Sequence, residues 1–95
     1  MKEPCVYILT NATRTVLYTG VTSNLRNRMA QHASGNGSIF TRKYRVHTLV
    51  YAEFFPRMND AIAMEKRIKS WPRKKKIELI EEQNPEWHDL FKGMG

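Results

Sequence analysis

The chain of 95 residues is long enough for one hydrophobic core and too short for a second, so residues 1–95 are expected to form a single domain. Sixteen Lys and Arg against nine Asp and Glu give a net charge of +7, which favours a polyanionic partner, although a surface that only keeps the protein soluble gives the same balance. A single cysteine, Cys5, excludes an internal disulfide and a cysteine-based zinc cluster.

The pattern of apolar residues contains no targeting or membrane segment. Residues 1–4 run directly into a strand-like segment, and no apolar stretch approaches the ~20 residues of a membrane span. The basic residues are spread along the chain without a broad apolar face beside them, which argues against an anionic membrane as the partner. We therefore expect a cytoplasmic protein.

Two β-favouring runs, residues 5–9 and 15–21, flank a turn-like segment and predict a hairpin. If the turn is centred on residues 12–13, Tyr7 lies opposite Tyr18 and both rings share a face of the sheet. A tyrosine in a strand is often only a packing residue, so this geometry alone does not define a site.

The elements after the hairpin follow from caps and helix breakers. The first is a helix capped by residues 22–24, which continues to Ala33 and is stopped by Gly35-Asn36-Gly37. An irregular or short helical stretch over 38–45 and a strand over 47–55 follow. The next helix is capped by Asn59 or Asp60 and ends near 71–72, and a basic helix then runs from Pro72 to Glu82. Asn84-Pro85 breaks that helix, and Trp87, Leu90 and Phe91 are expected to fold back as an apolar latch. The order ββαβαα predicts a mostly antiparallel sheet with helices packed on it, an α+β domain.

The first predicted helix carries a pair of polar residues beside its buried face. At about 100° per residue, Leu25, Met29 and Ala33 form an apolar stripe, and Arg28 and His32 lie together on one edge of it. The pair either flanks the stripe without a further role or points into a functional site.

The second predicted helix contains a carboxylate within its apolar arc. Ala61, Met64, Ile68 and Trp71 define that arc, and Glu65 falls inside it. A carboxylate there is unfavourable unless it meets a cation, a metal ion or hydrogen-bond donors. Glu65 is therefore either an edge residue paired with a basic side chain or a functional group.

Within this spread of basic residues, the second and third predicted helices are strongly basic, and the stretch over residues 38–45 is polar and basic. The basic residues either solvate the surface or contact phosphates, and each phosphate contact would add to the salt dependence of binding. The aromatic residues do not form a base-stacking platform of the RNA-recognition or oligonucleotide-barrel type. The candidate nucleic-acid contacts are Arg42, Lys43, Lys69, Arg73, Lys74 and Lys75.

Two triplets carry a family resemblance. Cys5-Val6-Tyr7 and Tyr18-Thr19-Gly20, separated by ten residues, resemble the triplets that name the GIY-YIG nuclease superfamily. The likeness continues through residues 21–28, the Arg28-x-x-x-His32 pair, residues 61–69 and residues 84–87, and it covers nearly the whole chain. The chain looks most like the short single-domain bacterial members.

The resemblance implies a three-stranded antiparallel sheet flanked by helices, and a metal-dependent endonuclease that hydrolyses DNA with little sequence specificity. Mg²⁺ is the implied cation, Mn²⁺ a possible substitute and DNA the implied partner, with no obligate protein partner; repair, recombination or handling of foreign DNA would suit such an enzyme. The implied site is Glu65 as metal ligand, Tyr7 as general base, Tyr18 positioning water or phosphate, Arg28 supplying charge, His32 relaying a proton, and Asn84 with no defined role.

Two departures and two alternatives accompany this reading. Cys5 and Val6 replace Gly and Ile in the first triplet, and Val21 stands where some relatives have a lysine, which weakens the case for activating Tyr7. The protein could instead be a catalytically inactive nucleic-acid-binding module of the same fold. A third reading is a protein-interaction domain anchored by Trp87 and Phe91.

Overall fold

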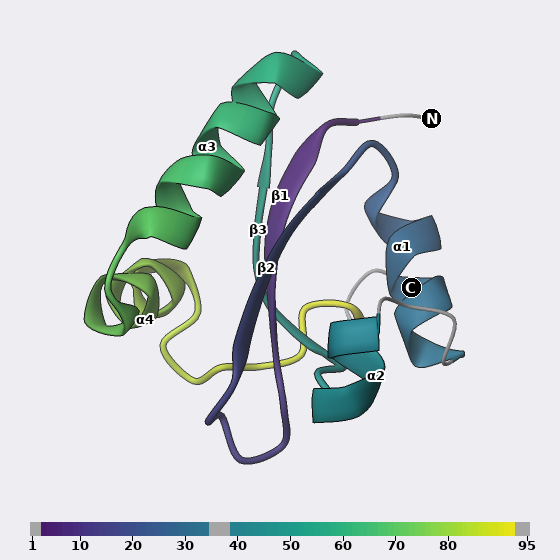
Figure 1. Ribbon diagram of the computed structural model, residues 1–95, viewed down its shortest axis with the longest axis vertical. Helices are drawn as coiled ribbons and strands as arrows, with labels where there is room; N and C mark the ends of the chain where they lie inside the picture. The colour runs from purple at the N-terminus through teal and green to yellow at the C-terminus, as the bar shows by residue number, and fades with distance from the viewer. Residues whose placement is uncertain (1–2, 35–38, 93–95) are drawn as a thin grey trace.

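A three-stranded antiparallel sheet forms the centre of the molecule (Figure 1). β1 (Cys5–Thr10) lies between β2 (Leu17–Thr22) and β3 (Thr48–Phe54). The computed structural model describes residues 3–34 and 39–92. It confirms the predicted α+β class and the three-stranded sheet with flanking helices.

Within residues 3–34 and 39–92, four helices cover the two faces of this sheet. α1 (Leu25–Ala33) and the short α2 (Ile39–Tyr44) lie on one side, and α3 (Met58–Ser70) and α4 (Arg73–Gln83) lie on the other (Figure 1). The order is ββααβαα, so the stretch that was expected to be irregular or short and helical contains one short helix. The expected helix breaker at residues 35–37 lies outside the described residues.

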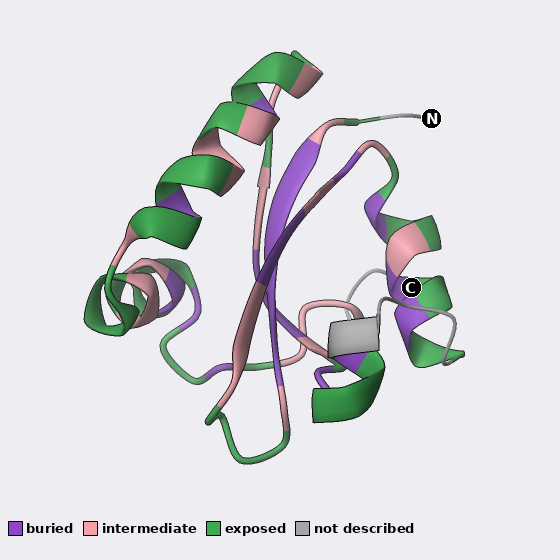
Figure 2. Ribbon diagram, in the orientation of Figure 1, coloured by how far each residue is buried: buried purple, intermediate pink, exposed green. Residues whose placement is uncertain are grey.

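The central strand is buried along its whole length (Figure 2). Because successive side chains of a strand point to opposite faces, β1 contributes to two separate cores. Tyr7 and Leu9 pack with Met29 on the α1 side, whereas Val6 and Ile8 pack with side chains of α3 and α4. The functional groups of α1 and α3 are therefore separated by the thickness of the sheet.

The hairpin register differs from the expected one by two residues. Tyr7 pairs with Gly20, and Tyr18 pairs with Leu9, so the two tyrosines are diagonal neighbours and not directly opposite each other. A shift of two preserves the face on which each side chain lies, because the strand period is two. The expectation of a shared face is confirmed, and the expected pairing is wrong.

The hairpin loop explains that shift. The Asn11 side-chain oxygen accepts hydrogen bonds from the backbone N–H groups of Thr15 and Val16, at 2.9 and 3.0 Å, which closes a loop longer than the expected turn. Arg14 adopts a left-handed backbone conformation with φ of 60° inside it. The centre of the turn therefore falls one residue later in the chain.

The helix starts agree in part with the expected caps. Asn24 caps α1, and its side chain accepts a hydrogen bond from the backbone N–H of Asn27 at 3.0 Å. The cap expected at Asn59 or Asp60 is wrong, because α3 begins earlier, after Arg57 in an extended conformation. Asp60 lies in the first turn, where its negative charge still complements the positive end of the helix dipole.

The C-terminal region follows the expected outline with a shift of one residue. Pro72 is the N-cap of α4 and Arg73 is its first helical residue, so the expected start at Pro72 is one residue early. After α4 the chain folds back over the sheet, with Trp87 buried and with Leu90 and Phe91 half-buried. The Leu90 N–H donates to the Leu49 carbonyl at 2.8 Å, which confirms the apolar latch.

Candidate active site

Three aromatic rings gather on the α1 face of the sheet. Tyr7 comes from β1, Tyr18 from β2 and His32 from α1. The Tyr7 centroid lies 6.4 Å from that of Tyr18, and the His32 centroid lies 6.2 Å from each tyrosine. These distances are typical of packed aromatic rings in tilted or edge-on contact. Three of the predicted site residues thus form one cluster.

Tyr7 is the innermost member of the cluster. The residue is fully buried, whereas Tyr18 is half-buried and therefore reaches the surface. Burial raises the pKa of Tyr7 to about 12; the neighbouring Tyr18 adds to this rise, and the charge and a hydrogen bond of Arg28 oppose it. The protonated phenol is therefore the favoured form in the free protein, so Tyr7 could act as a base only by passing its own proton to another group.

Arg28 lies at the edge of the same cluster. It is half-buried on α1, one helical turn before His32. Its effect on the pKa of Tyr7 places the guanidinium within reach of the buried hydroxyl. The predicted pairing of Arg28 with His32 beside the sheet is therefore found, with one difference: His32 is buried and Ala33 is exposed, so the histidine and not the alanine completes the buried stripe.

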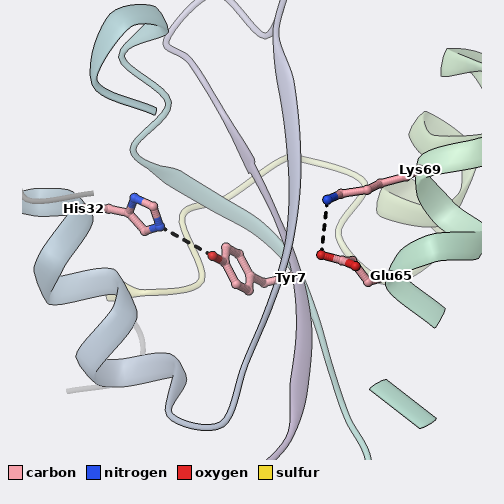
Figure 3. A network of polar contacts seen from close by, with 4 residues as sticks. All are labelled: Tyr7, His32, Glu65 and Lys69. Carbon is pink, nitrogen blue, oxygen red and sulfur yellow. Dashed lines mark hydrogen bonds and ion pairs between the residues drawn. The ribbon is translucent and has the colours of Figure 1, made fainter. Parts of the chain in front are cut away.

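His32 is held by contacts to both of its ring nitrogens. Nε2 lies 3.5 Å from the Tyr7 hydroxyl (Figure 3), and Nδ1 lies 3.2 Å from the Thr41 hydroxyl. A protonated Nδ1 donating to Thr41 would leave Nε2 free to accept the Tyr7 proton. Burial lowers the pKa of His32, and the charges of Arg28 and His47 lower it further. The neutral imidazole is therefore the favoured form.

Thr41 is the member of this site that sequence reasoning missed. It is fully buried on α2, although it is directly followed by Arg42 and Lys43 in a stretch expected to be irregular or a short helix. Because Thr41 is nine residues from His32 and no periodic pattern links them, only the folded chain reveals the contact.

Glu65 does not join this cluster. It lies on α3, and its carboxylate pairs with the Lys69 ammonium at 3.2 Å on the opposite side of the sheet from Tyr7 and His32 (Figure 3). The expectation of a partly buried carboxylate in an apolar arc is met, since its side chain is 15% exposed. The structure therefore brings four of the five predicted residues together and leaves Glu65 across the sheet.

The donor set near Glu65 limits the type of metal site. Among residues 3–34 and 39–92, no group of three His, Cys, Asp or Glu side chains comes together as a metal cage. A single carboxylate can hold Mg²⁺, because this ion keeps several of its waters and takes further ligands from substrate phosphate. Glu65 fits such a one-ligand site, in which Lys69 would have to give way or share the carboxylate.

The candidate phosphate-binding residues lie in two separate places. Arg42 and Lys43 are exposed on α2, on the side of the aromatic cluster. Lys69, Arg73, Lys74 and Lys75 lie on α3 and α4, across the sheet. Several of these have partners within the chain: Arg73 donates to the Arg14 carbonyl at 2.9 Å, and Lys75 lies 4.2 Å from the centre of the Trp71 ring.

The side chain of Asn84 is hydrogen-bonded to backbone groups of two neighbouring segments. Its amide donates to the backbone carbonyls of Val50 and His88, at 3.1 and 2.9 Å, and its oxygen accepts from the His88 N–H at 3.0 Å. The side chain is buried and connects the end of α4 to β3. Asn84 therefore braces the C-terminal turn.

In this small α+β domain a buried cluster of aromatic rings and an imidazole lies beside an arginine on one face of the β2-β1-β3 sheet. The profile of the GIY-YIG catalytic domain matches residues 3–78. The chain belongs to the GIY-YIG family, a nuclease family whose domain implies a nucleic-acid substrate.

Proteins of similar sequence carry the family label UPF0213. A UPF0213 protein of Staphylococcus haemolyticus is 40% identical over 67 residues, which are 70% of this chain and 82% of that protein. Another, from Syntrophus aciditrophicus, is 38% identical over 87 residues, covering 90% and 98% of the two chains. The NMR structure of a UPF0213 protein from Bacillus halodurans superposes with a TM-score of 0.60 at 31% identity, covering 93% of each chain.

Among the described residues, no helix is both long and apolar enough to cross a membrane.

Proposed function

We propose that this protein is a metal-dependent endonuclease that hydrolyses DNA phosphodiester bonds with little sequence specificity. The observation that carries the proposal is the cluster of Tyr7, Tyr18 and His32 beside Arg28 in a domain of the GIY-YIG family. A packing core would not require phenol hydroxyls, an imidazole bonded through both nitrogens and an adjacent guanidinium.

The roles follow from which groups substrate can reach. Arg28 and Tyr18 are half-buried, so they can contact a phosphate at the surface. Arg28 binds the scissile phosphate and stabilises the charge that develops on it. Tyr18 positions the attacking water. Because Tyr7 is buried behind it, we assign Tyr7 the role of carrying a proton to His32.

Proton transfer uses the neutral imidazole. Tyr7 passes its hydroxyl proton to Nε2 of His32 as it takes up the proton of the attacking water, and Thr41 holds Nδ1. The contact of 3.5 Å is long for a hydrogen bond, and catalytic hydrogen bonds often tighten only when substrate is bound.

Glu65 is the proposed metal ligand in spite of its position across the sheet. α3 packs against β2 and β1, so it lies over the half of the sheet that ends in the outer strand β2. A DNA strand at this edge would have to reach around β2, to Tyr18 and Arg28 on one face of the sheet and to the carboxylate of α3 on the other. When bound, a divalent cation would supply Lewis acidity to the phosphate and stabilise the leaving oxygen.

The test is a cleavage panel of single-stranded, duplex and branched oligonucleotides with Mg²⁺, Mn²⁺ or EDTA. Wild type should cleave at least one substrate with a divalent cation and none with EDTA. Glu65→Gln should abolish cleavage with little change in Tm, whereas Glu78→Gln, the same change at an exposed site on α4, should cleave like wild type. Full cleavage by Glu65→Gln would reject the metal assignment.

One observation favours a second function. Glu65 is paired with Lys69 and faces away from Tyr7, as a catalytically inactive nucleic-acid-binding module of the same fold would allow. That module would bind oligonucleotides in a salt-dependent manner and would cleave none of them with any divalent cation. The same panel therefore separates the two functions.

A further inference from the structure

A groove of about 350 Å³ lies between the hairpin loop and the segment that follows α2. One wall is formed by residues 11–13, and the other by Tyr44, Arg45, His47 and Thr48. The loop wall is held in place, because the Asn11 side chain bonds to the backbone and hydroxyl groups of the same loop. A groove of this size suits one small planar group and not a folded partner.

Tyr44 gives this groove an aromatic surface. Its side chain is 42% exposed, and it is one of two large hydrophobic residues exposed to this degree among those described. The Lys43 ammonium lies over this ring, 5.5 Å from its centre. A base that stacks on the ring would displace this flexible ammonium from the ring face, and the ammonium could then meet the phosphate of the same nucleotide.

Arg45 occupies a position at which glycine is usual. The Val46 N–H donates to the Thr41 carbonyl at 3.2 Å and closes the end of α2, and Arg45 has a left-handed φ of 54° at this closure. A side chain in this conformation is strained. The strained position carries an exposed arginine among the residues that line the groove, and a glycine there would bring no charge.

The groove lies near the cluster of Tyr7, Tyr18 and His32. Tyr44 lies one helical turn after Thr41, whose hydroxyl contacts His32. His47, which also lines the groove, lies close enough to His32 for its charge to affect that imidazole. A nucleotide in the groove would therefore be a near neighbour of one bound at Arg28.

We propose that this groove binds one unpaired nucleotide adjacent to the scissile phosphate, with its base stacked on Tyr44 and its phosphate held by Arg45 and Lys43. This inference rests on the proposed nuclease function, and it specifies the substrate as single-stranded DNA or a branch with an unpaired flank. A base within a continuous duplex is already stacked on both faces and cannot enter.

The first test measures binding without cleavage. Fluorescence anisotropy in EDTA compares a labelled 12-mer of thymidine with a 12-base-pair duplex. Tyr44→Leu should weaken single-strand binding about 5- to 100-fold, and Tyr44→Phe, which keeps the ring, should stay within about twofold of wild type. Duplex binding should change less than twofold in both variants. Wild-type affinity of Tyr44→Leu for the single strand, or an equal loss on the duplex, would overturn the subsite.

The second test uses the backbone strain at Arg45. Arg45→Gly should raise Tm, because glycine adopts the left-handed conformation without strain, and yet weaken single-strand binding. Arg57→Gly is the control for the lost charge, because Arg57 is exposed and is the N-cap of α3. The start of α3 lies at the opposite end of the sheet from the hairpin loop (Figure 1). Equal losses of single-strand binding in the two variants would reduce Arg45 to a general charge and overturn its assignment.

Failure of the proposed subsite can be distinguished from failure of the proposed nuclease function. If wild type cleaves nothing with any metal but Tyr44→Leu still loses single-strand binding, the nuclease proposal fails and the nucleotide subsite stands. If wild type cleaves and Tyr44→Leu binds and cleaves equally well, the subsite fails and the nuclease stands.

Discussion

The ring of Tyr7 lies across the backbone of Gly20, its partner on the neighbouring strand. A Cβ built on Gly20 would lie 2.5 Å from both Cζ and Oη of the tyrosine and 2.9 Å from its Cε2. Real Cβ atoms do not approach other atoms so closely, so the glycine of the second triplet is required by the tyrosine of the first. The two triplets are therefore parts of one packing arrangement.

Gly20→Ala should test that arrangement. Because Tyr7 is fully buried and cannot swing outward, the added methyl group should lower the free energy of unfolding by about 1–3 kcal/mol. Chemical denaturation measures this loss. In a Tyr7→Leu background, where the ring tip is absent, the cost of Gly20→Ala should largely disappear. An equal cost in both backgrounds would mean that another contact causes the loss.

The two tyrosines should differ in their contribution to cleavage. Tyr18→Phe removes the hydroxyl of a half-buried side chain and should lower kcat by about 10²-fold or more. Tyr7→Phe removes the buried hydroxyl and should also lower kcat, because the route to His32 is lost. Since neither change removes a ring, both variants should retain Tm within a few degrees. Full cleavage by Tyr18→Phe would contradict its proposed role in positioning water.

Thr41 should act on the reaction through His32. Thr41→Val keeps the shape of the side chain and removes the hydroxyl, leaving Nδ1 of His32 without that partner, at a cost of about 1–3 kcal/mol in stability. Cleavage should fall, and ¹⁵N NMR of the imidazole should show a changed tautomer population. Thr41→Ser should restore both signals. A variant that loses stability but keeps the wild-type tautomer would reduce Thr41 to a packing role.

The stability of the protein should depend on the titration of His32. Its pKa in the folded state lies below the ordinary value of 6.5, so below that pH the unfolded chain binds more protons than the folded one. The contribution of the neutral imidazole is complete above pH 6.5 and is lost as the pH falls from 6.5 through the lower, folded pKa. Tm measured from pH 8 to pH 5 should therefore fall more for wild type than for His32→Gln. Parallel curves would show that other groups cause the fall.

Much of the fold could be predicted because its signals are local. The apolar runs of β1 and β3, the cap at Asn24 and the apolar arc of α3 all depend on residues close in sequence. The predicted start of α3 was too late, because polar residues inside the first turn of a helix resemble caps. The predicted start of α4 was one residue early, because the first helical residue depends on how the chain leaves the preceding segment.

The candidate site could be predicted only in part. Arg28 and His32 lie one helical turn apart, and that spacing alone placed them side by side. The contact between Thr41 and His32, and the position of Glu65 across the sheet, depend on which face each helix covers. The resemblance named the residues, but the inaccessibility of Tyr7 follows from three-dimensional packing and not from its motif.

The fold of the C-terminal tail has a consequence for self-association. The outer strand β3 has its Leu49 carbonyl bonded to the Leu90 N–H, its Leu49 N–H to the Asp89 carboxylate, and its Val50 carbonyl to Asn84. A strand from a second copy would have to displace these bonds before it could extend the sheet there. The tail thus occupies backbone groups of an edge strand that could otherwise pair with another chain. A variant that lacks the tail should therefore aggregate through β3.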